Sequence, residues 1–200
     1  SKEGLKLGRP SLTNGELCLW ASSDASYYSK DGTSHVGHTI SVGCNNGPIL
    51  AISKRHPTVS TSSAEAELKG FTFCAQNVDW ITNILKSVYR IKNIGTAIIE
   101  VDNEPARKAV IGANLTKNLK HISSKYLYAR LAYQEQRILF VYCKTVFLLS
   151  DTLTKPLAGA KFFKFKARLL GEYVAEHHNR ELILPDKNKT KLYTGNIRQI

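Results

Sequence analysis

The longest regular pattern of hydrophobic positions in the chain runs over residues 62–89 and predicts a helix with one face against a core. The apolar residues recur at helical spacing, and they are Leu68, Phe71, Ala75, Val78, Ile81 and Leu85. Hydroxyl residues at 60–63 come directly before this stripe, which is typical of a capped helix start. The rest of the chain is expected to pack around this helix.

Short apolar runs predict the strands. Three precede the long helix, at 17–21, 35–43 and 49–54, and two follow it, at 96–101 and 138–143. Shorter helices are expected at 105–110, around 126–133, at 148–154 and at 162–170. Strands joined by turns run antiparallel, whereas strands joined through a helix run parallel by a right-handed crossover. The predicted fold class is therefore α/β, with a five-stranded mixed sheet and helices on both faces.

Length and composition favour one domain. The 200 residues, 42% of them hydrophobic, are enough for a single core. Residues 1–16 predict a linker or an irregular lead-in, 17–171 the domain, and 172–200 a charged C-terminal extension. The chain contains no methionine, which is expected of a segment cut from a longer polypeptide and equally of a chain that has lost its initiator.

The charge of the chain adds a candidate partner. A net charge of +12 points to a polyanion, most simply nucleic acid, although basic residues that only solvate the surface would give the same value. The four cysteines show no metal-ligand spacing, which favours buried thiols in a reducing compartment. No apolar run approaches the length of a membrane span, and no signal-peptide pattern is found at residues 1–10.

Two glutamates lie in the first turns of the long helix and face different ways. Glu65 aligns with Lys69, and the two are expected to form an ordinary surface pair. Glu67 aligns with the apolar stripe through Phe71 and Val78. Its carboxylate therefore either hangs over the end of the stripe or lines a site, and the pattern leaves both alternatives open.

Three further acids are placed where they could meet Glu67. Asp24 closes the first predicted strand and Asp102 the fourth, so both emerge at one sheet edge if those strands are parallel neighbours. Asp151 lies on the short helix after the last strand. Each acid alone is more simply explained as a turn, cap or helix-end residue. Together they form a carboxylate cluster that needs a cation.

Such a cluster suits a particular chemistry. Hard oxygen ligands with room for water favour Mg²⁺ or Mn²⁺. Two such ions, about 3.5–4 Å apart, are a standard device for phosphodiester cleavage. An acidic metal site in a basic chain is therefore what a nuclease requires.

Ordered motifs along residues 17–171 resemble the ribonuclease H domain of Ty1/copia-type retrotransposon polyproteins. The matching pieces are Ser23-Asp24-Ala25, the 37–43 strand leading to Gly47-Pro48-Ile49, the segment 62–67, Asp102-Asn103 with Ala106, Lys120-His121-Ile122, and the segment 150–157. The chain departs from the family at 144–149, which is largely apolar where the family usually has polar residues. It also has no histidine there, before Asp151.

The resemblance implies a ribonuclease H-like fold and an endonuclease that hydrolyses the RNA strand of RNA–DNA hybrids with two Mg²⁺ or Mn²⁺ ions. The family's catalytic, metal-binding acids fall on Asp24, Glu67, Asp102 and Asp151. The resemblance also implies the reverse transcriptase polymerase domain of the same polyprotein as a partner. The expected location is the cytoplasm, within virus-like particles, or the nucleus, with no membrane partner.

Candidate contacts to nucleic acid lie beside these acids and in a basic stretch. They are Ser62, Ser63, Asn103, Lys117, Lys120, His121 and Lys125, with Arg130 as a further phosphate contact. The serines could equally cap the long helix. Asn103 could either read a minor-groove edge or brace the turn that follows the fourth strand. A second basic patch, which could face a neighbouring polymerase domain instead of substrate, consists of Lys161, Lys164, Lys166 and Arg168.

Two other functions are compatible with the same fold. A non-catalytic module would use it for nucleic-acid binding or docking to a polymerase, and a missing acid would favour that hypothesis, but all four are present. A strand transferase of the integrase type requires the order aspartate, aspartate, glutamate, whereas here Glu67 comes second. The hybrid nuclease is therefore the leading hypothesis.

Overall fold

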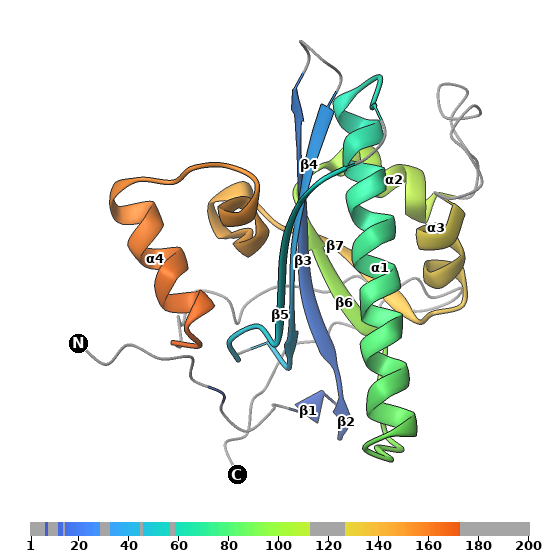
Figure 1. Cartoon of the computed structure of the whole chain (residues 1–200). Helices are drawn as coiled ribbons and strands as arrows, with labels where there is room; N and C mark the ends of the chain where they lie inside the picture. The colour runs from blue at the N-terminus through green and yellow to red at the C-terminus, as the bar shows by residue number, and fades with distance from the viewer. Residues whose placement is uncertain are drawn as a thin grey trace.

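The computed structural model describes most of the predicted domain and part of the segment before it (Figure 1). The described residues are 7, 12–13, 15–28, 33–44, 46–56, 59–112 and 127–172. Within them, five strands form one mixed sheet with the order β5-β4-β3-β6-β7. This architecture confirms the predicted fold class.

The elements follow one another as the sequence pattern predicts. Antiparallel strands β3 (Leu19–Tyr28), β4 (Thr33–Val42) and β5 (Leu50–Arg55) come first. Helix α1 (Ser63–Ser87) leads to β6 (Ala97–Val101), which is parallel to β3. After α2 (Glu104–Ile111) and α3 (Leu127–Gln134), β7 (Ile138–Tyr142) lies parallel to β6. Two 3-10 helices, η3 (Thr145–Phe147) and η4 (Leu149–Leu153), precede helix α4 (Gly159–Leu169).

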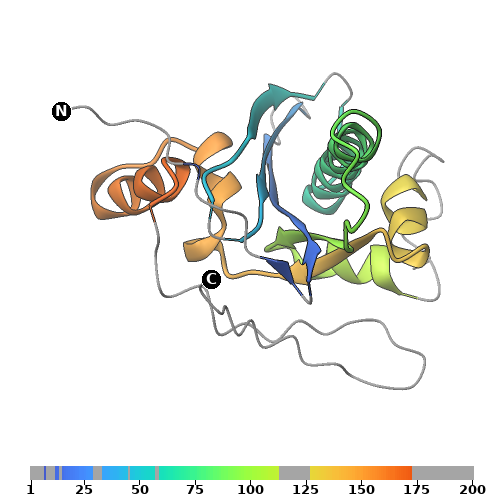
Figure 2. The same cartoon turned by 90° about the horizontal axis from the view of Figure 1, so that it is seen from below.

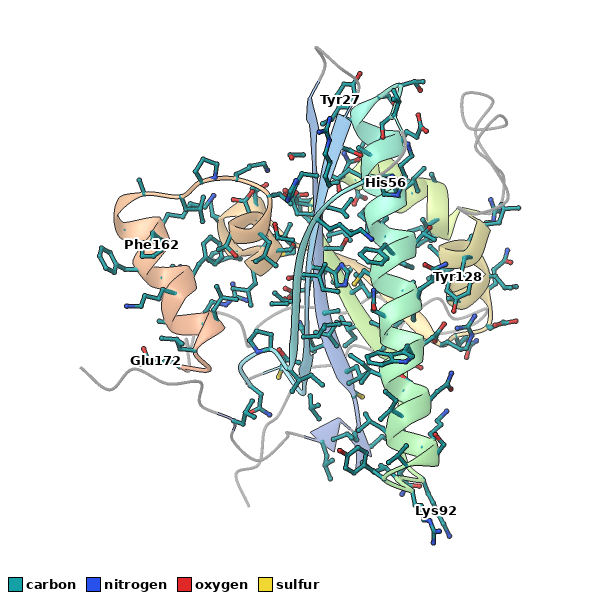
Figure 3. The ribbon with its side chains drawn as sticks, viewed as in Figure 1. Tyr27, His56, Lys92, Tyr128, Phe162 and Glu172 are labelled. Atoms are coloured by element: carbon teal, nitrogen blue, oxygen red, sulfur yellow. The ribbon has the colours of Figure 1, made fainter. Side chains whose placement is uncertain are left out.

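Helices cover both faces of the sheet (Figures 1 and 2). Helices α1, α2 and α3 lie together on one face, and η4 and α4 lie on the other. The main core lies between α1 and the sheet, and its buried side chains include Leu19, Ile40, Phe71, Val78, Ile99 and Phe140. Tyr128 of α3 faces α1 (Figure 3), where its hydroxyl donates to Asp79 at 2.5 Å.

Hydrogen bonds on both sides of the cap fix the start of α1. Ser62 is the N-cap, and its hydroxyl accepts from the backbone N–H of Glu65 at 3.2 Å. Lys69 is only 2% exposed, and its Nζ donates to the Val59 carbonyl at 2.6 Å and to Ser60 Oγ at 2.9 Å. The pair with Glu65 forms at 3.1 Å. The prediction of an ordinary surface pair is nevertheless wrong, because the loop before the helix covers the lysine.

Strand β3 is longer than the hydrophobic pattern predicts. The pattern ends the strand at Ala21, whereas β3 continues to Tyr28. Strand β4 pairs with β3 along its whole length, and Ser22 Oγ lies 2.8 Å from Thr39 Oγ1 across the pair. The ladder of β4 therefore extends the strand through a polar stretch. As a result, Asp24 lies inside the strand rather than at its end.

The segment before the sheet contains a small hairpin, in a region predicted to be a linker or irregular. Strand β1 (Leu12–Thr13) pairs antiparallel with β2 (Glu16–Leu17).

All four cysteines carry thiols rather than disulfides, as the sequence predicts, and Cys44 is the one that is not buried. Among the described helices, none combines the length and the apolar character that crossing a membrane requires. Of the predicted C-terminal extension, all but Glu172 lies outside the described residues.

Candidate metal centre

Three carboxylates from three different elements meet at one rim of the sheet. Asp24 comes from β3, Glu67 from the second turn of α1, and Asp102 from the residue directly after β6. One oxygen of each carboxylate lies within 4.8 Å of the others. The parallel register of β3 and β6 explains the meeting, because Ser22 pairs with Glu100 and the next two residues bring both aspartates to the same level.

Of the three acids, Glu67 has the least favourable electrostatic surroundings. Its side chain lies under the sheet rim, and the residue is 4% exposed. Within the part of the chain that the structure describes, its Oε2 atom is buried and has no hydrogen-bond partner. Burial, together with the negative charges of Asp24 and Asp102, raises the pKa of Glu67 to about 9. Without a cation, this carboxyl group therefore holds a proton at neutral pH.

Asp24 is more completely buried, at 1% exposed, but has partners. The hydroxyl of Thr154 donates to its Oδ2, and the Nζ of Lys155 lies 3.5 Å from the same oxygen. Burial still raises the pKa of Asp24, with help from the charges of Asp102 and Asp151, although Thr154 and Lys155 oppose the rise. The hydrogen-bond donors and positive charge beside the cluster therefore do not fully offset its negative charge.

Asp102 has the most open position of the three. It is half-buried, and its Oδ2 accepts a hydrogen bond of 2.6 Å from the hydroxyl of Thr145 in η3. The next residue, Asn103, caps helix α2, and its side-chain oxygen accepts from the backbone N–H of Ala106 at 2.9 Å. Of the two alternatives for Asn103, bracing the turn is therefore the one that the hydrogen bond supports.

Asp151 is held next to the cluster but is not part of it. It lies in η4, is 1% exposed, and accepts from Lys155 Nζ at 2.7 Å and from Lys161 Nζ at 2.5 Å. Burial would raise its pKa, but the hydrogen bonds and charges of the two lysines lower it below the usual value. Since Lys155 also contacts Asp24, one ammonium group links the fourth acid to one member of the cluster.

Helix η4 reaches the rim because a glycine on β4 lets it approach the sheet. A Cβ atom on Gly37 would lie 2.7 Å from the Cβ of Leu153 and 2.9 Å from the Cγ2 of Thr154. Gly37 is the β4 residue that pairs with Asp24. The glycine therefore sets the distance between the 151–155 segment and the acids of the sheet.

The residues present fit a divalent cation. Carboxylates accept hydrogen bonds but do not donate them when ionised, so a group of three needs positive charge between its members. The buried, unpartnered Oε2 of Glu67 is the clearest sign, because buried polar atoms are otherwise almost always satisfied. An all-oxygen donor set is the one that Mg²⁺ and Mn²⁺ prefer.

Comparisons with known proteins identify relatives of this chain. No protein-family model matches the chain. The chain is 30% identical, over 155 residues or 76% of its length, to the retrovirus-related Pol polyprotein from transposon RE1 of Arabidopsis thaliana. The identity and coverage are the same for the polyprotein from transposon RE2 of that plant. The chain spans about a tenth of the length of these relatives, since the match covers 10% of each.

Solved structures decide the fold. LC11-RNase H1, isolated from compost by a metagenomic approach, superposes with a TM-score of 0.53 at 14% identity, over 68% of this chain and 91% of that one. The chain has the ribonuclease H fold. The same RNase H1 in complex with an RNA/DNA hybrid gives 0.52 at 14% identity, covering 68% and 92%. The N-terminal RNase H domain of a Mycobacterium tuberculosis protein gives 0.51 at 12%, covering 69% and 91%.

On this ribonuclease H fold, the other predicted contact residues have mixed surroundings. Ser62 and Ser63 are exposed at the start of α1, and Ser62 acts as a cap. Arg130 donates to the Gly112 carbonyl at 2.8 Å, so part of its guanidinium is used inside the protein. Four predicted contacts lie outside the described residues, namely Lys117, Lys120, His121 and Lys125.

The predicted second basic patch on α4 is turned partly inward. Lys161 binds Asp151, and Lys164 lies over the ring of Phe147 with its Nζ 4.8 Å from the ring centroid. Arg168 donates to the carbonyl of Phe147. These contacts attach α4 to η3 and η4, while Phe162 points away from the sheet (Figure 3).

Sequence reasoning did not assign four residues of the site to the acids, although it placed one of them, Lys161, in the second basic patch. They are Thr145, Thr154, Lys155 and Lys161. One of them had a readable signal, because Asp151 and Lys155 are four residues apart, the spacing of a helical ion pair. Thr145 and Lys161 reach the acids only through tertiary packing.

Proposed function

We propose that this chain is a metal-dependent endoribonuclease that hydrolyses the RNA strand of RNA–DNA hybrids during retrotransposon reverse transcription. The observation that supports it best is the cluster of Asp24, Glu67 and Asp102, whose oxygens lie within 4.8 Å of one another on a ribonuclease H fold. Homology to transposon Pol polyproteins supports the biological setting. The polymerase domain of the same polyprotein is the corresponding partner.

In this proposal each acid has a definite role. Asp24, Glu67 and Asp102 would hold one divalent cation, and Asp24 together with Asp151 would hold a second. A bound pair of Mg²⁺ or Mn²⁺ ions supplies activation of the attacking water and stabilisation of the leaving oxygen. Asp24 is the residue that both ions would share, so its orientation matters most.

The surrounding residues would fix the acids in place. The hydroxyl of Thr154 orients Asp24, and that of Thr145 orients Asp102. The burial of Glu67 keeps bulk water from one side of the cluster. Preorganised ligands of this kind avoid the cost of reorganising the site during the reaction.

The substrate is inferred from charge and from the fold. A chain with a net charge of +12 attracts a nucleic-acid backbone electrostatically. The exposed hydroxyls of Ser62 and Ser63 lie at the start of the helix that carries Glu67, where they could contact the backbone or a 2′-hydroxyl. The similar RNase H1 was crystallised with an RNA/DNA hybrid, which is the class of substrate proposed here.

The direct test is cleavage of a hybrid whose RNA strand carries a label. The wild-type protein should cleave it with Mg²⁺ and not with EDTA, and Asp102→Asn should abolish cleavage while circular dichroism shows an intact fold. Glu135→Gln is the matched control, because it also neutralises one acid but at an exposed ion pair with Arg137. Undiminished activity in Asp102→Asn would refute the proposal. An intact hybrid in every lane, with binding retained, would favour a non-catalytic module.

A further inference from the structure

A lysine side chain lies between two of the acids that the proposed function assigns to metal binding. The Nζ of Lys155 is 2.7 Å from Asp151 Oδ1 and 3.5 Å from Asp24 Oδ2. Both aspartates are 1% exposed, whereas the lysine side chain is 45% exposed. A half-exposed cation from the chain itself therefore bridges two buried anions.

The position of Lys155 is the one that a second divalent ion would need. The first ion would use the three clustered acids Asp24, Glu67 and Asp102. A second ion about 3.5–4 Å from the first would have to share one of those carboxylates and take a further oxygen ligand. Asp24 and Asp151 are the pair that can provide this, and the ammonium group of Lys155 already contacts both.

We propose that Lys155 is a built-in counterion that occupies the second cation position and is displaced when the second ion binds. This inference rests on the proposed function, because it assumes that the acids bind divalent ions. It makes the two ions unequal: the first binds beside the lysine, and the second binds only after the lysine has moved.

The surroundings of Lys155 allow this movement. Its backbone is anchored, since its N–H donates to the Asp151 carbonyl at 3.2 Å. Its half-exposed side chain can turn toward solvent without opening the core. Lys161 differs, because Asp151 is the one acid that it contacts among the described residues. Displacing Lys155 therefore removes an ammonium contact from both aspartates, whereas displacing Lys161 removes one from Asp151 alone.

The energetic consequence follows from competition. The apparent dissociation constant of a ligand rises in inverse proportion to the fraction of protein that is ready to bind it. If Lys155 is away from the acids for one molecule in about ten or fewer, the second ion binds about tenfold or more weakly than it otherwise would. Without any ion, the same lysine offsets part of the repulsion among the acids.

Titration calorimetry with Mn²⁺ on the metal-free protein tests the proposal without substrate. The neutral variant Lys155→Met should bind the second ion about tenfold or more tightly than wild type, and its metal-free form should melt at a lower temperature. Lys155→Arg keeps the charge and should keep the weak second site. Lys86→Met is the matched control, because it removes one exposed lysine from the far end of α1 and should change neither result.

The outcomes separate this inference from the proposed function. Wild-type protein that binds no Mn²⁺ would contradict both. Wild-type protein that binds Mn²⁺, with Lys155→Met equal to Lys86→Met or weaker in its second site, would overturn only the role of Lys155. If Lys155→Met is unfolded without metal, Mn²⁺ should restore its circular dichroism spectrum, and failure to do so would also overturn the proposal.

Discussion

Glu67 and Asp151 are buried carboxylates at the same rim of the sheet, yet their surroundings are opposite. Glu67 has an unpartnered oxygen and two negative neighbours, and its pKa is about 9. Asp151 accepts hydrogen bonds from the ammonium groups of Lys155 and Lys161, which lower its pKa below the usual value. One acid needs a cation from solution, and the other receives its cations from the chain.

The difference shows that burial alone does not decide the state of an acid. Both residues are at most 4% exposed, so desolvation penalises both charges. The partners decide the outcome, and they come from different places. The lysines lie four and ten residues after Asp151, whereas the neighbours of Glu67 are brought by two strands of the sheet. A cluster of acids whose charge is only partly compensated is costly, which is expected of a site kept for function.

The largest expected effect comes from neutralising each of these two acids in turn. Glu67→Gln keeps the shape but removes a ligand, so the affinity for the first Mg²⁺ should fall about 100-fold. The metal-free stability should not fall, because the folded protein no longer has to take up a proton at this position. Asp151→Asn should instead destabilise the metal-free protein by about 1–2 kcal/mol, since two half-exposed lysines lose their partner.

Calorimetry for Mg²⁺ affinity and urea unfolding for stability measure the two responses. Glu135→Gln again provides the control for the loss of one exposed acid. The comparison fails if the two variants respond alike, with equal losses of both metal affinity and metal-free stability.

A second effect is the dependence of stability on pH. The folded-state pKa of Glu67, about 9, is above its usual value of 4.5, so the folded protein binds a proton that the unfolded chain releases. The stability that this proton provides is complete below about pH 4.5 and is lost as the pH rises through about 9. Below about pH 6.5 the buried His38, whose pKa burial lowers to about 4, contributes an opposite slope, so the loss of about 1 kcal/mol per pH unit is expected from about pH 7 to 9.

Urea unfolding at about pH 7, 7.5 and 8 in EDTA measures this slope, above the range in which His38 contributes. Glu67→Gln should flatten it, and saturating Mg²⁺ should remove it, because a bound cation replaces the proton. Metal-free stability that rises over this range would contradict the assigned state of Glu67.

Part of this comparison could be predicted from the sequence. The alignment with the apolar stripe of α1 separated Glu67 from Glu65 but left open whether Glu67 lines a site, and its buried position favours that alternative. The sequence pattern also ended the fourth strand correctly, directly before Asp102, and so predicted its position at the rim. These predictions succeed because helical and strand periodicity are local properties of the chain.

Other features depend on contacts that no local pattern shows. Strand β3 continues past Ala21 because β4 pairs with it along its length. Lys69 is buried because the loop at Val59 and Ser60 folds over it. Lys155 and Lys161 contact Asp151 because η4 turns back on itself and because α4 packs against η4. The sequence predicted that four acids would converge, but not that the chain's own cations would separate one from the rest.

A smaller effect should follow from moving η4 without touching any acid. An alanine at Gly37 would press its Cβ against Leu153 and Thr154, both closer than 3.0 Å, and η4 must shift outward. We expect a loss of about 1 kcal/mol in stability, together with weaker binding of the second ion. Gly70→Ala is the control, since its nearest contact would be Ser23 Oγ at an ordinary 3.4 Å.

Urea unfolding and Mn²⁺ calorimetry of the two alanine variants measure these effects. A Gly37→Ala protein that matches Gly70→Ala in both would show that the close approach of η4 does not set the geometry of Asp151.

The central claim is that Asp24, Glu67 and Asp102 together bind a divalent ion, and a crystal soaked in Mn²⁺ tests it most directly. The account predicts an anomalous scattering peak with one oxygen of each of these three carboxylates at about 2.1–2.2 Å, in the range typical of hard-cation ligands. A peak elsewhere, or none at saturating Mn²⁺, would contradict it.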